Sequence, residues 1–248
     1  MADLFTPSRM SQPIAPHGCF VTGTDTEVGK TRISAALLHW CVNQGWRSAG
    51  FKPVAAGLEQ ADGRWINADV QALRQAGSAP LTDAEVGPCQ FKAACAPHLA
   101  AAMEGRVIDF DSLLGAARQL ALRSDALVVE GVGGFVVPLG ADKDTADLAQ
   151  ALGLPVVLVV GLRLGCINHA LLTAESVRAR GLRLAGWVGN TVDPDMPWVD
   201  GNLATLRDLL MARHGAVSLG WVPRLLDPSP QSILSHLDPA SLRQVFDR

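Results

Sequence analysis

Short, uninterrupted apolar runs alternate with longer segments of helical period along most of this chain, and this alternation limits the possible folds most strongly. The runs lack a polar residue at every second position, which is typical of strands covered on both faces of their sheet. We expect such strands at residues 19–22, 49–53, 126–130, 155–161, 184–190 and 216–221. The pattern predicts an α/β fold in which a parallel β-sheet is flanked by helices.

Helical periodicity marks the segments between the expected strands, at residues 30–46, 111–123, 145–152, 168–180 and 202–213. Each is long enough for the crossover that joins two parallel strands. The least regular part, residues 57–97, is expected to form an insertion over the sheet edge. Because no linker, charge block or repeat divides the chain, we predict a single domain over residues 18–248, preceded by a flexible leader over residues 1–17.

Composition and charge exclude several classes of protein. Hydrophobic residues make up 48% of the 248 residues and charged residues 18%, so the chain is not of the disordered type. A net charge of -3 gives no positive field for a nucleic-acid backbone. The longest uncharged apolar stretch, at 151–162, has about twelve residues where ~20 are needed to span a bilayer. Neither a nucleic acid nor a membrane is expected as a partner, and five scattered cysteines predict reduced thiols in the cytoplasm.

A glycine-rich loop follows the first expected strand and opens the first expected helix. Its sequence, G-T-D-T-E-V-G-K-T at residues 23–31, places backbone N–H groups at a helix N-terminus, where the helix dipole favours an anion. Lys30 can reach the β- and γ-phosphates of a nucleotide, and the Thr31 hydroxyl can ligate Mg²⁺. The first glycine stands one residue earlier than in the common G-x-x-x-x-G-K-[ST] pattern. The alternative is a chance Gly-Lys-Thr, which the preceding strand and following helix disfavour.

A carboxylate, Glu130, ends the expected strand 126–130 and is followed by Gly131, Gly133 and Gly134. The C-terminal ends of parallel strands line the ligand crevice, so Glu130 should emerge beside the phosphate loop. There it can hold Mg²⁺ directly or through water. The alternative is an exposed glutamate at the start of a turn.

Lys52 stands in a run that otherwise suits the sheet interior, where an unpaired ammonium would be costly, so it needs an anionic partner. If its strand neighbours the first strand, Lys52 points toward the phosphate site. The alternative is a lysine that reaches solvent from an edge strand. Asp69 carries a weaker signal, because Asn and Asp before a helical stretch are more often caps than ligands.

A second turn, L-G-C-I-N-H at residues 164–169, follows a buried strand and precedes a helix. Its backbone amides form another possible anion site, suited to a small carboxylate. A nucleophilic role for Cys166 beside His169 lacks a third orienting group, so a buried thiol in a capping turn is favoured. His98 is interpreted as structural or substrate-shaping.

Taken in order, these segments resemble the dethiobiotin synthetase family over residues 20–225. The matching motifs are F-V-T-G-T-D-T-E-V-G-K-T (20–31), K-P-V (52–54), P-H-L-A-A (97–101), V-E-G-V-G-G (129–134), L-G-C-I-N-H-A-L-L-T (164–173) and A-G-W-V-G-N (185–190). The resemblance implies a P-loop NTPase-like fold and a homodimeric cyclo-ligase of biotin biosynthesis, with its sites at the dimer interface. Such an enzyme uses ATP, Mg²⁺ and CO₂ to convert 7,8-diaminopelargonic acid into dethiobiotin, with ADP and phosphate as the other products. The reaction passes through a carbamate and a carbamic-phosphoric anhydride.

The resemblance also implies residue roles. Lys30 and Lys52 would be catalytic, neutralising the carbamate and the transferring phosphoryl group. Mg²⁺ would be held by Thr31, Asp69 and Glu130. The implied nucleotide contacts are Glu27, Val28, Gly29, Lys30, Thr31, Arg32, Asp69, Glu130, Gly131, Val132, Gly133, Asn190, Thr191, Pro223, Arg224 and Leu225. The implied substrate contacts are Lys52, Ala56, Val132 and Gly133 and, from across the dimer interface, Gly165, Cys166, Ile167 and Asn168.

Two positions depart from the family pattern. Ala56 stands in a segment where Ser or Thr is common, so a side-chain hydrogen bond to the substrate is replaced or missing. No clear acidic residue follows Pro223 near the adenine, where Asp227 is the only nearby carboxylate, so looser base selectivity is expected.

Two other functions compete with this interpretation. The amidation enzymes of cobalamin synthesis carry an additional glutaminase domain, for which 248 residues leave no room. Partition-type switch ATPases place an extra lysine early in the phosphate loop, which residues 24–26 lack, and their membrane-binding members end in a basic amphipathic helix, unlike residues 232–248. ATP turnover that depends on the diamine and CO₂ would distinguish a ligase from a switch.

Overall fold

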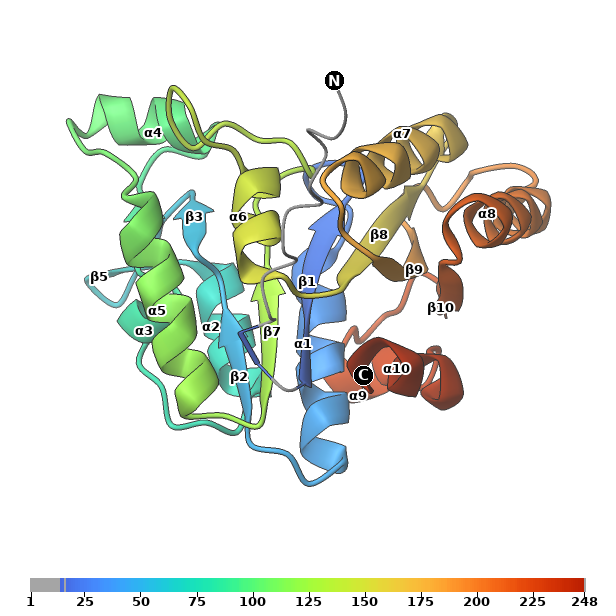
Figure 1. The fold of residues 1–248 in the computed structure, drawn as a ribbon, viewed down its shortest axis with the longest axis horizontal. Helices are drawn as coiled ribbons and strands as arrows, with labels where there is room; N and C mark the ends of the chain where they lie inside the picture. Colours follow the sequence, from blue (N-terminus) through green and yellow to red (C-terminus); the bar gives the residue numbers. More distant parts are fainter. Residues whose placement is uncertain (1–13, 16, 248) are drawn as a thin grey trace, which may run out of the picture.

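Six parallel strands form the central sheet of this computed structural model, which describes residues 14, 15 and 17–247. The strand order is β10-β9-β8-β1-β7-β2, and every neighbouring pair runs parallel (Figure 1). The strands are β1 (His17–Gly23), β2 (Ser48–Phe51), β7 (Ala126–Glu130), β8 (Val156–Leu162), β9 (Leu184–Thr191) and β10 (Val217–Val222). All six lie where the sequence predicts them, with ends displaced by at most two residues, and the predicted fold class is confirmed.

Helices cover both faces of the sheet. One face carries α1 (Lys30–Asn43), α2 (Ala68–Ala76), α9 (Pro230–Leu234) and α10 (Pro239–Phe246), and the other carries α5 (Phe110–Leu122), α6 (Thr145–Leu152), α7 (Cys166–Ala179) and α8 (Val199–His214). Along β1, Cys19 and Val21 pack into the core beneath α1, and Phe20 packs into the core on the opposite face of the sheet. Because helices cover both faces, the strands are mainly apolar and show no polar residue at every second position. Among the described residues, no helix combines the length and apolar composition needed to cross a membrane.

The predicted insertion after β2 consists of short elements. It contains the antiparallel hairpin β4 (Glu59–Ala61) and β5 (Arg64–Ile66), the helices α2 and α3 (Asp83–Val86), and strand β6 (Cys89–Phe91). Strand β3 (Val54–Ala56), which pairs in parallel with β6, precedes the predicted insertion, and α4 (Pro97–Met103) begins at its last residue. Not all of it lies over the sheet edge, because α2 packs against α1 and β2 as a member of the helix layer.

Several element ends differ from the prediction for local backbone reasons. Helix α1 stops at Asn43 rather than at residue 46, because Gly45 adopts a left-handed conformation with φ 81°. Helix α7 begins at Cys166, two residues before its predicted start, and α8 begins at Val199 rather than at residue 202. His17, predicted to belong to the leader, is the first residue of β1. Residues 1–13 and 16 of the predicted leader lie outside the described residues.

Candidate functional site

A cleft of about 1350 Å³ opens at the C-terminal ends of the central strands. In a parallel sheet the strands end, and the helices after them begin, at the same edge. Ligands of such sheets bind at that edge. Most residues that the sequence singles out line this one cleft: Glu27, Gly29, Lys30, Thr31, Arg32, Lys52, Ala56, Asp69, Glu130, Val132, Gly133, Asn190, Thr191, Pro223, Arg224 and Leu225.

The N-terminus of α1 is a bare helix end that faces this cleft. Its N-cap, Gly29, has φ 90°, no side chain accepts a hydrogen bond from the first-turn amides, and the first turn holds no acid. A Cβ at residue 29 would lie 2.3 Å from Nδ2 of Asn190, so only glycine lets β9 approach this closely. Asn190 Nδ2 in turn donates to the carbonyl of Val28 at 2.9 Å. Free amides at the positive end of a helix dipole suit a phosphate group.

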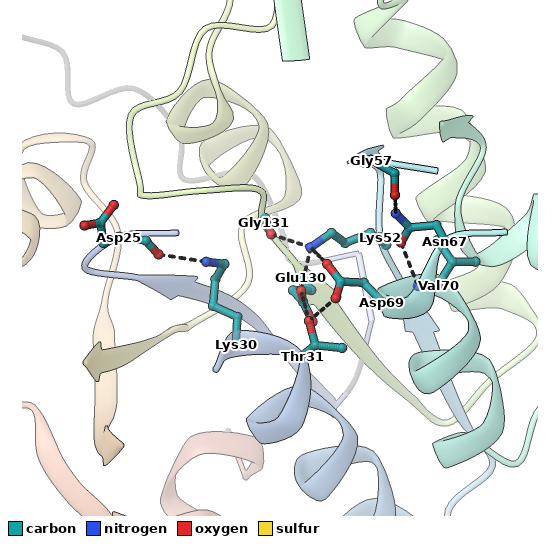
Figure 2. A network of polar contacts seen from close by, with 10 residues as sticks. All are labelled: Asp25, Lys30, Thr31, Lys52, Gly57, Asn67, Asp69, Val70, Glu130 and Gly131. Carbon is teal, nitrogen blue, oxygen red and sulfur yellow. Dashed lines mark hydrogen bonds and ion pairs between the residues drawn. The ribbon is translucent and has the colours of Figure 1, made fainter. Parts of the chain in front are cut away.

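Lys52 lies among carboxylates at the bottom of the cleft (Figure 2). Its Nζ is 2.5 Å from Oε1 of Glu130 and 2.9 Å from Oδ2 of Asp69, and it donates to the carbonyl of Gly131 at 3.2 Å. Lys52 is 3% exposed and Glu130 is fully buried. An ammonium at this depth is tolerated only beside anionic partners. The partner that the sequence predicts for Lys52 is therefore present.

Lys52 reaches the cleft by a different path from the predicted one. Strand β2 does not neighbour β1, because β7 lies between them. Lys52 directly follows β2 and meets Glu130, which is the last residue of β7. The condition set for Lys52, that its strand neighbours the first strand, is not met, although the side chain does line the cleft. The alternative of a lysine reaching solvent from an edge strand is wrong, since the side chain is buried.

The Thr31 hydroxyl connects the two carboxylates. Its Oγ1 lies 2.7 Å from Oδ1 of Asp69 and 2.8 Å from Oε1 of Glu130. The second Glu130 oxygen, Oε2, is buried and has no hydrogen-bond partner among the described residues. Hydroxyl and carboxylate oxygens fit Mg²⁺, which proteins commonly hold with one or two carboxylates and the phosphates of a substrate. Asp69 is not a helix cap, because Asn67 caps α2 by accepting from Val70 N at 3.1 Å.

Burial and neighbouring charges shift the pKa values of the cleft residues. Burial, followed by repulsion from Lys52, lowers the pKa of Lys30 to about 8, and Lys30 Nζ donates to the carbonyl of Asp25 at 2.9 Å. Burial alone would lower the pKa of Lys52, but the carboxylates of Glu130 and Asp69 outweigh it and raise that pKa. Burial would raise the pKa of Asp69, but Lys52 lowers it. Near neutral pH the cleft thus presents two ammonium groups beside the bare helix end.

The second predicted anion site lies outside this cleft. Gly165, with φ 93°, caps α7, whose first turn has neither a side-chain cap nor an acid. Leu164 is 91% exposed, whereas Cys166 is buried, so its thiol is not available to a ligand. An ion pair between Arg163 and Asp25 joins the turn before α7 to the turn before α1. The four predicted contacts at this end of α7 do not line the cleft of the same chain: Gly165, Cys166, Ile167 and Asn168.

Two predicted nucleotide contacts, Val28 and Gly131, also do not line the cleft. Both support it through their backbones, because the carbonyl of Val28 accepts from Asn190 and that of Gly131 accepts from Lys52. The sequence does not single out the pair of Asp25 and Arg163, which stand 138 residues apart and leave no local signal.

Comparisons with known proteins agree with this architecture. A family model described as an AAA domain matches residues 17–232. The MinC:MinD cell division protein complex of Aquifex aeolicus is similar at a TM-score of 0.51 and 13% identity, over 87% of this chain and 86% of that one. The MinD cell division protein of the same organism is similar at 0.50 and 14%, over 92% and 94%. At such identities the likeness concerns the fold alone.

Proposed function

Because the chain belongs to the AAA domain family and has an ATPase-type P-loop fold, we propose that it is an ATP- and Mg²⁺-dependent cyclo-ligase of the dethiobiotin synthetase type. A domain of this family is also found in dethiobiotin synthetase. The proposed substrates are 7,8-diaminopelargonic acid, CO₂ and ATP. The observation that carries the proposal is the pair of buried cations, Lys30 and Lys52, in one cleft with the bare N-terminus of α1.

The nucleotide would occupy the part of the cleft beside α1. The backbone amides of residues 27–32 would bind its phosphates, and the Lys30 ammonium would leave the Asp25 carbonyl to contact the β- and γ-phosphates. The base would lie between the end of β9 and the segment after β10, framed by Asn190, Thr191, Pro223, Arg224 and Leu225.

Thr31, Asp69 and Glu130 would hold Mg²⁺, because their oxygens already converge and the buried Oε2 of Glu130 lacks a partner among the described residues. When bound, Mg²⁺ would offset phosphate charge during transfer. Glu130 and Asp69 would then contact both Lys52 and Mg²⁺. Lys52 would therefore be less fully neutralised by these carboxylates and could stabilise negative charge on the reacting groups.

The proposed chemistry begins when one amine of the diamine attacks CO₂ and loses a proton, which forms a carbamate. A carbamate oxygen attacks the γ-phosphorus and ADP leaves, which gives a carbamic-phosphoric anhydride. The second amine attacks the carbamate carbon and loses a proton, phosphate leaves, and the cyclic urea closes. Lys30 and Lys52 would stabilise the negative oxygens of these steps, mainly through position and charge.

The carboxylate tail of the diamine would bind at the N-terminus of α7 of a second copy of the chain, where the first turn is uncapped. This arrangement would make the enzyme a homodimer with its sites at the interface. The exposed Leu164 next to Gly165 suits a position that a partner chain covers.

Phosphate release from Mg-ATP and bicarbonate, with and without diaminopelargonate, tests the proposed function. We expect release to depend on the diamine, and mass spectrometry of the organic product to give the mass of dethiobiotin. ATP hydrolysis at the same rate with and without the diamine, and with no new organic product, would overturn the proposed ligase activity and favour a nucleotide-driven switch.

A further inference from the structure

Asn67 makes two hydrogen bonds that join separate segments at the edge of the cleft (Figure 2). Its Oδ1 accepts from the backbone N–H of Val70 at 3.1 Å and caps α2. Its Nδ2 donates to the carbonyl of Gly57 at 3.3 Å. The side chain is 5% exposed, so both bonds are protected from competition with water. A single amide therefore links α2 to the segment that follows β3.

This link lies at the base of the hairpin formed by β4 and β5. The chain leaves the cleft after Glu59, turns at Asp62 and Gly63 with φ 49° and 73°, and returns at Asn67. The Gly57 N–H donates to the carbonyl of Ala93 at 3.2 Å. Gly57 is thus held from both sides, and Asn67 connects α2 to a backbone that is already fixed.

Asp69 depends on this link more than the other carboxylate does. Glu130 is fully buried at the end of a central strand, whereas the Asp69 side chain is 41% exposed and belongs to the first turn of α2. Packing therefore fixes Glu130, whereas the position of Asp69 depends on its contacts with Lys52 and Thr31 and on where α2 begins. Residues that hold a metal ligand in place commonly change metal affinity by about 10–100-fold when altered.

We propose that Asn67 is a positioning residue, whose bridge from α2 to Gly57 holds the Asp69 carboxylate beside the Thr31 hydroxyl, where both would be ligands of the cation. The inference rests on the proposed Mg²⁺ and nucleotide site. Through Gly57 the same bridge joins the metal side of the cleft to Ala56, on the proposed substrate side.

Two substitutions separate the bridge from the helix cap. Asn67→Asp keeps an acceptor for Val70 N but loses the donor to Gly57, and its extra negative charge would by itself attract a cation. Asn67→Ser also keeps the cap and adds no charge. The control is Asn202→Asp, which removes an exposed amide donor from α8 to the carbonyl of Trp198, the N-cap of that helix, away from the cleft.

Binding of Mn²⁺ in the presence of a non-hydrolysable ATP analogue, measured by electron paramagnetic resonance on the full chain, is the first readout. We expect about tenfold weaker Mn²⁺ binding in both Asn67 variants and less than about twofold change in the control. Hydrogen exchange over residues 68–76 is the second readout and should stay close to that of the unaltered chain, since the cap remains.

Mn²⁺ affinity within about twofold of the unaltered chain in both Asn67 variants would overturn the positioning role while leaving the proposed function standing. Failure of both variants to fold, or rapid exchange throughout α2, would make Asn67 a stability residue and reject the proposal as well. If the unaltered chain binds no Mn²⁺ with the analogue, the proposed metal site itself fails and the bridge with it.

Discussion

The N-termini of α1 and α7 have the same local structure but different surroundings. Each follows a buried parallel strand, each is capped by a glycine in the left-handed conformation, and neither has a side-chain cap or an acid in its first turn. Beside α1 lie buried lysines and carboxylates in a deep cleft. Beside α7 lies the exposed Leu164, and an ion pair of Arg163 with Asp25 joins the turn before α7 to the turn before α1.

Under the proposed function, the same bare helix end would bind a different anion in each place, because its neighbours differ. At α1, cations and metal-type ligands suit a polyphosphate that must react. At α7, amides without side-chain partners in the first turn suit a single carboxylate that only has to be held.

The largest effect is expected where the charge cluster beside α1 is broken. Lys52→Met should lower turnover ~100–1000-fold, because a cation aimed at developing negative charge is lost. It should also lower the free energy of unfolding by about 3–5 kcal/mol, because Glu130 stays buried without its partner. Steady-state rates and urea unfolding measure the two effects.

The double variant Lys52→Met/Glu130→Gln is the control for this experiment. It removes both buried charges together, so most of the stability should return while activity should not. Near-normal turnover in Lys52→Met would contradict a catalytic role for Lys52.

The second prediction concerns the pH dependence of nucleotide binding at α1. Burial lowers the pKa of Lys30 to about 8, and a bound phosphate favours the charged form of the lysine. Below that pH Lys30 is already protonated. As the pH rises above it, binding must take up a proton, and affinity should fall by up to about tenfold per pH unit. Calorimetry with a non-hydrolysable ATP analogue between pH 7 and 9.5 tests this, and Lys30→Gln should abolish the slope.

The third prediction tests the end of α7. Asn168→Asp places an acid in the first turn, which stabilises a helix but repels a docked carboxylate. We expect the KM for the diamine to rise about tenfold, a change of ~1.4 kcal/mol, with an unchanged KM for ATP and an unchanged or slightly higher Tm. The neutral variant Asn168→Ser is the control. Equal KM values for the diamine in the unaltered chain and both variants would show that this helix end does not bind the substrate.

The smallest effect is expected where the two helix ends are joined. Arg163→Ala removes the partner of the Asp25 carboxylate, but both side chains are nearly half exposed, so the loss should be below about 1 kcal/mol. We expect the KM for ATP to rise by about two- to fivefold, with a smaller difference at high salt. A change above about tenfold would mean that the pair does more than steady the turn before α1.

Local patterns were sufficient for most of the fold. The apolar runs located all six central strands, and the extent of 126–130 was predicted without error, as was that of helix 145–152. Helix ends were less accurate, because a single left-handed glycine, such as Gly45 or Gly165, moves an end by two or three residues. The general preference for Asn and Asp as helix caps holds for Asn67, which caps α2, and does not hold for Asp69.

By itself the sequence determined which residues form strands and helices and which helix begins with bare amides, because periodicity and backbone preference act over a few neighbouring residues. Only the tertiary structure decided which charges meet. Lys52 and Glu130 are 78 residues apart, and Arg163 and Asp25 are 138 apart. Their contacts follow from the strand order, with β7 between β1 and β2 and β8 on the other side of β1. That order is set by packing of the whole sheet, which no local segment encodes.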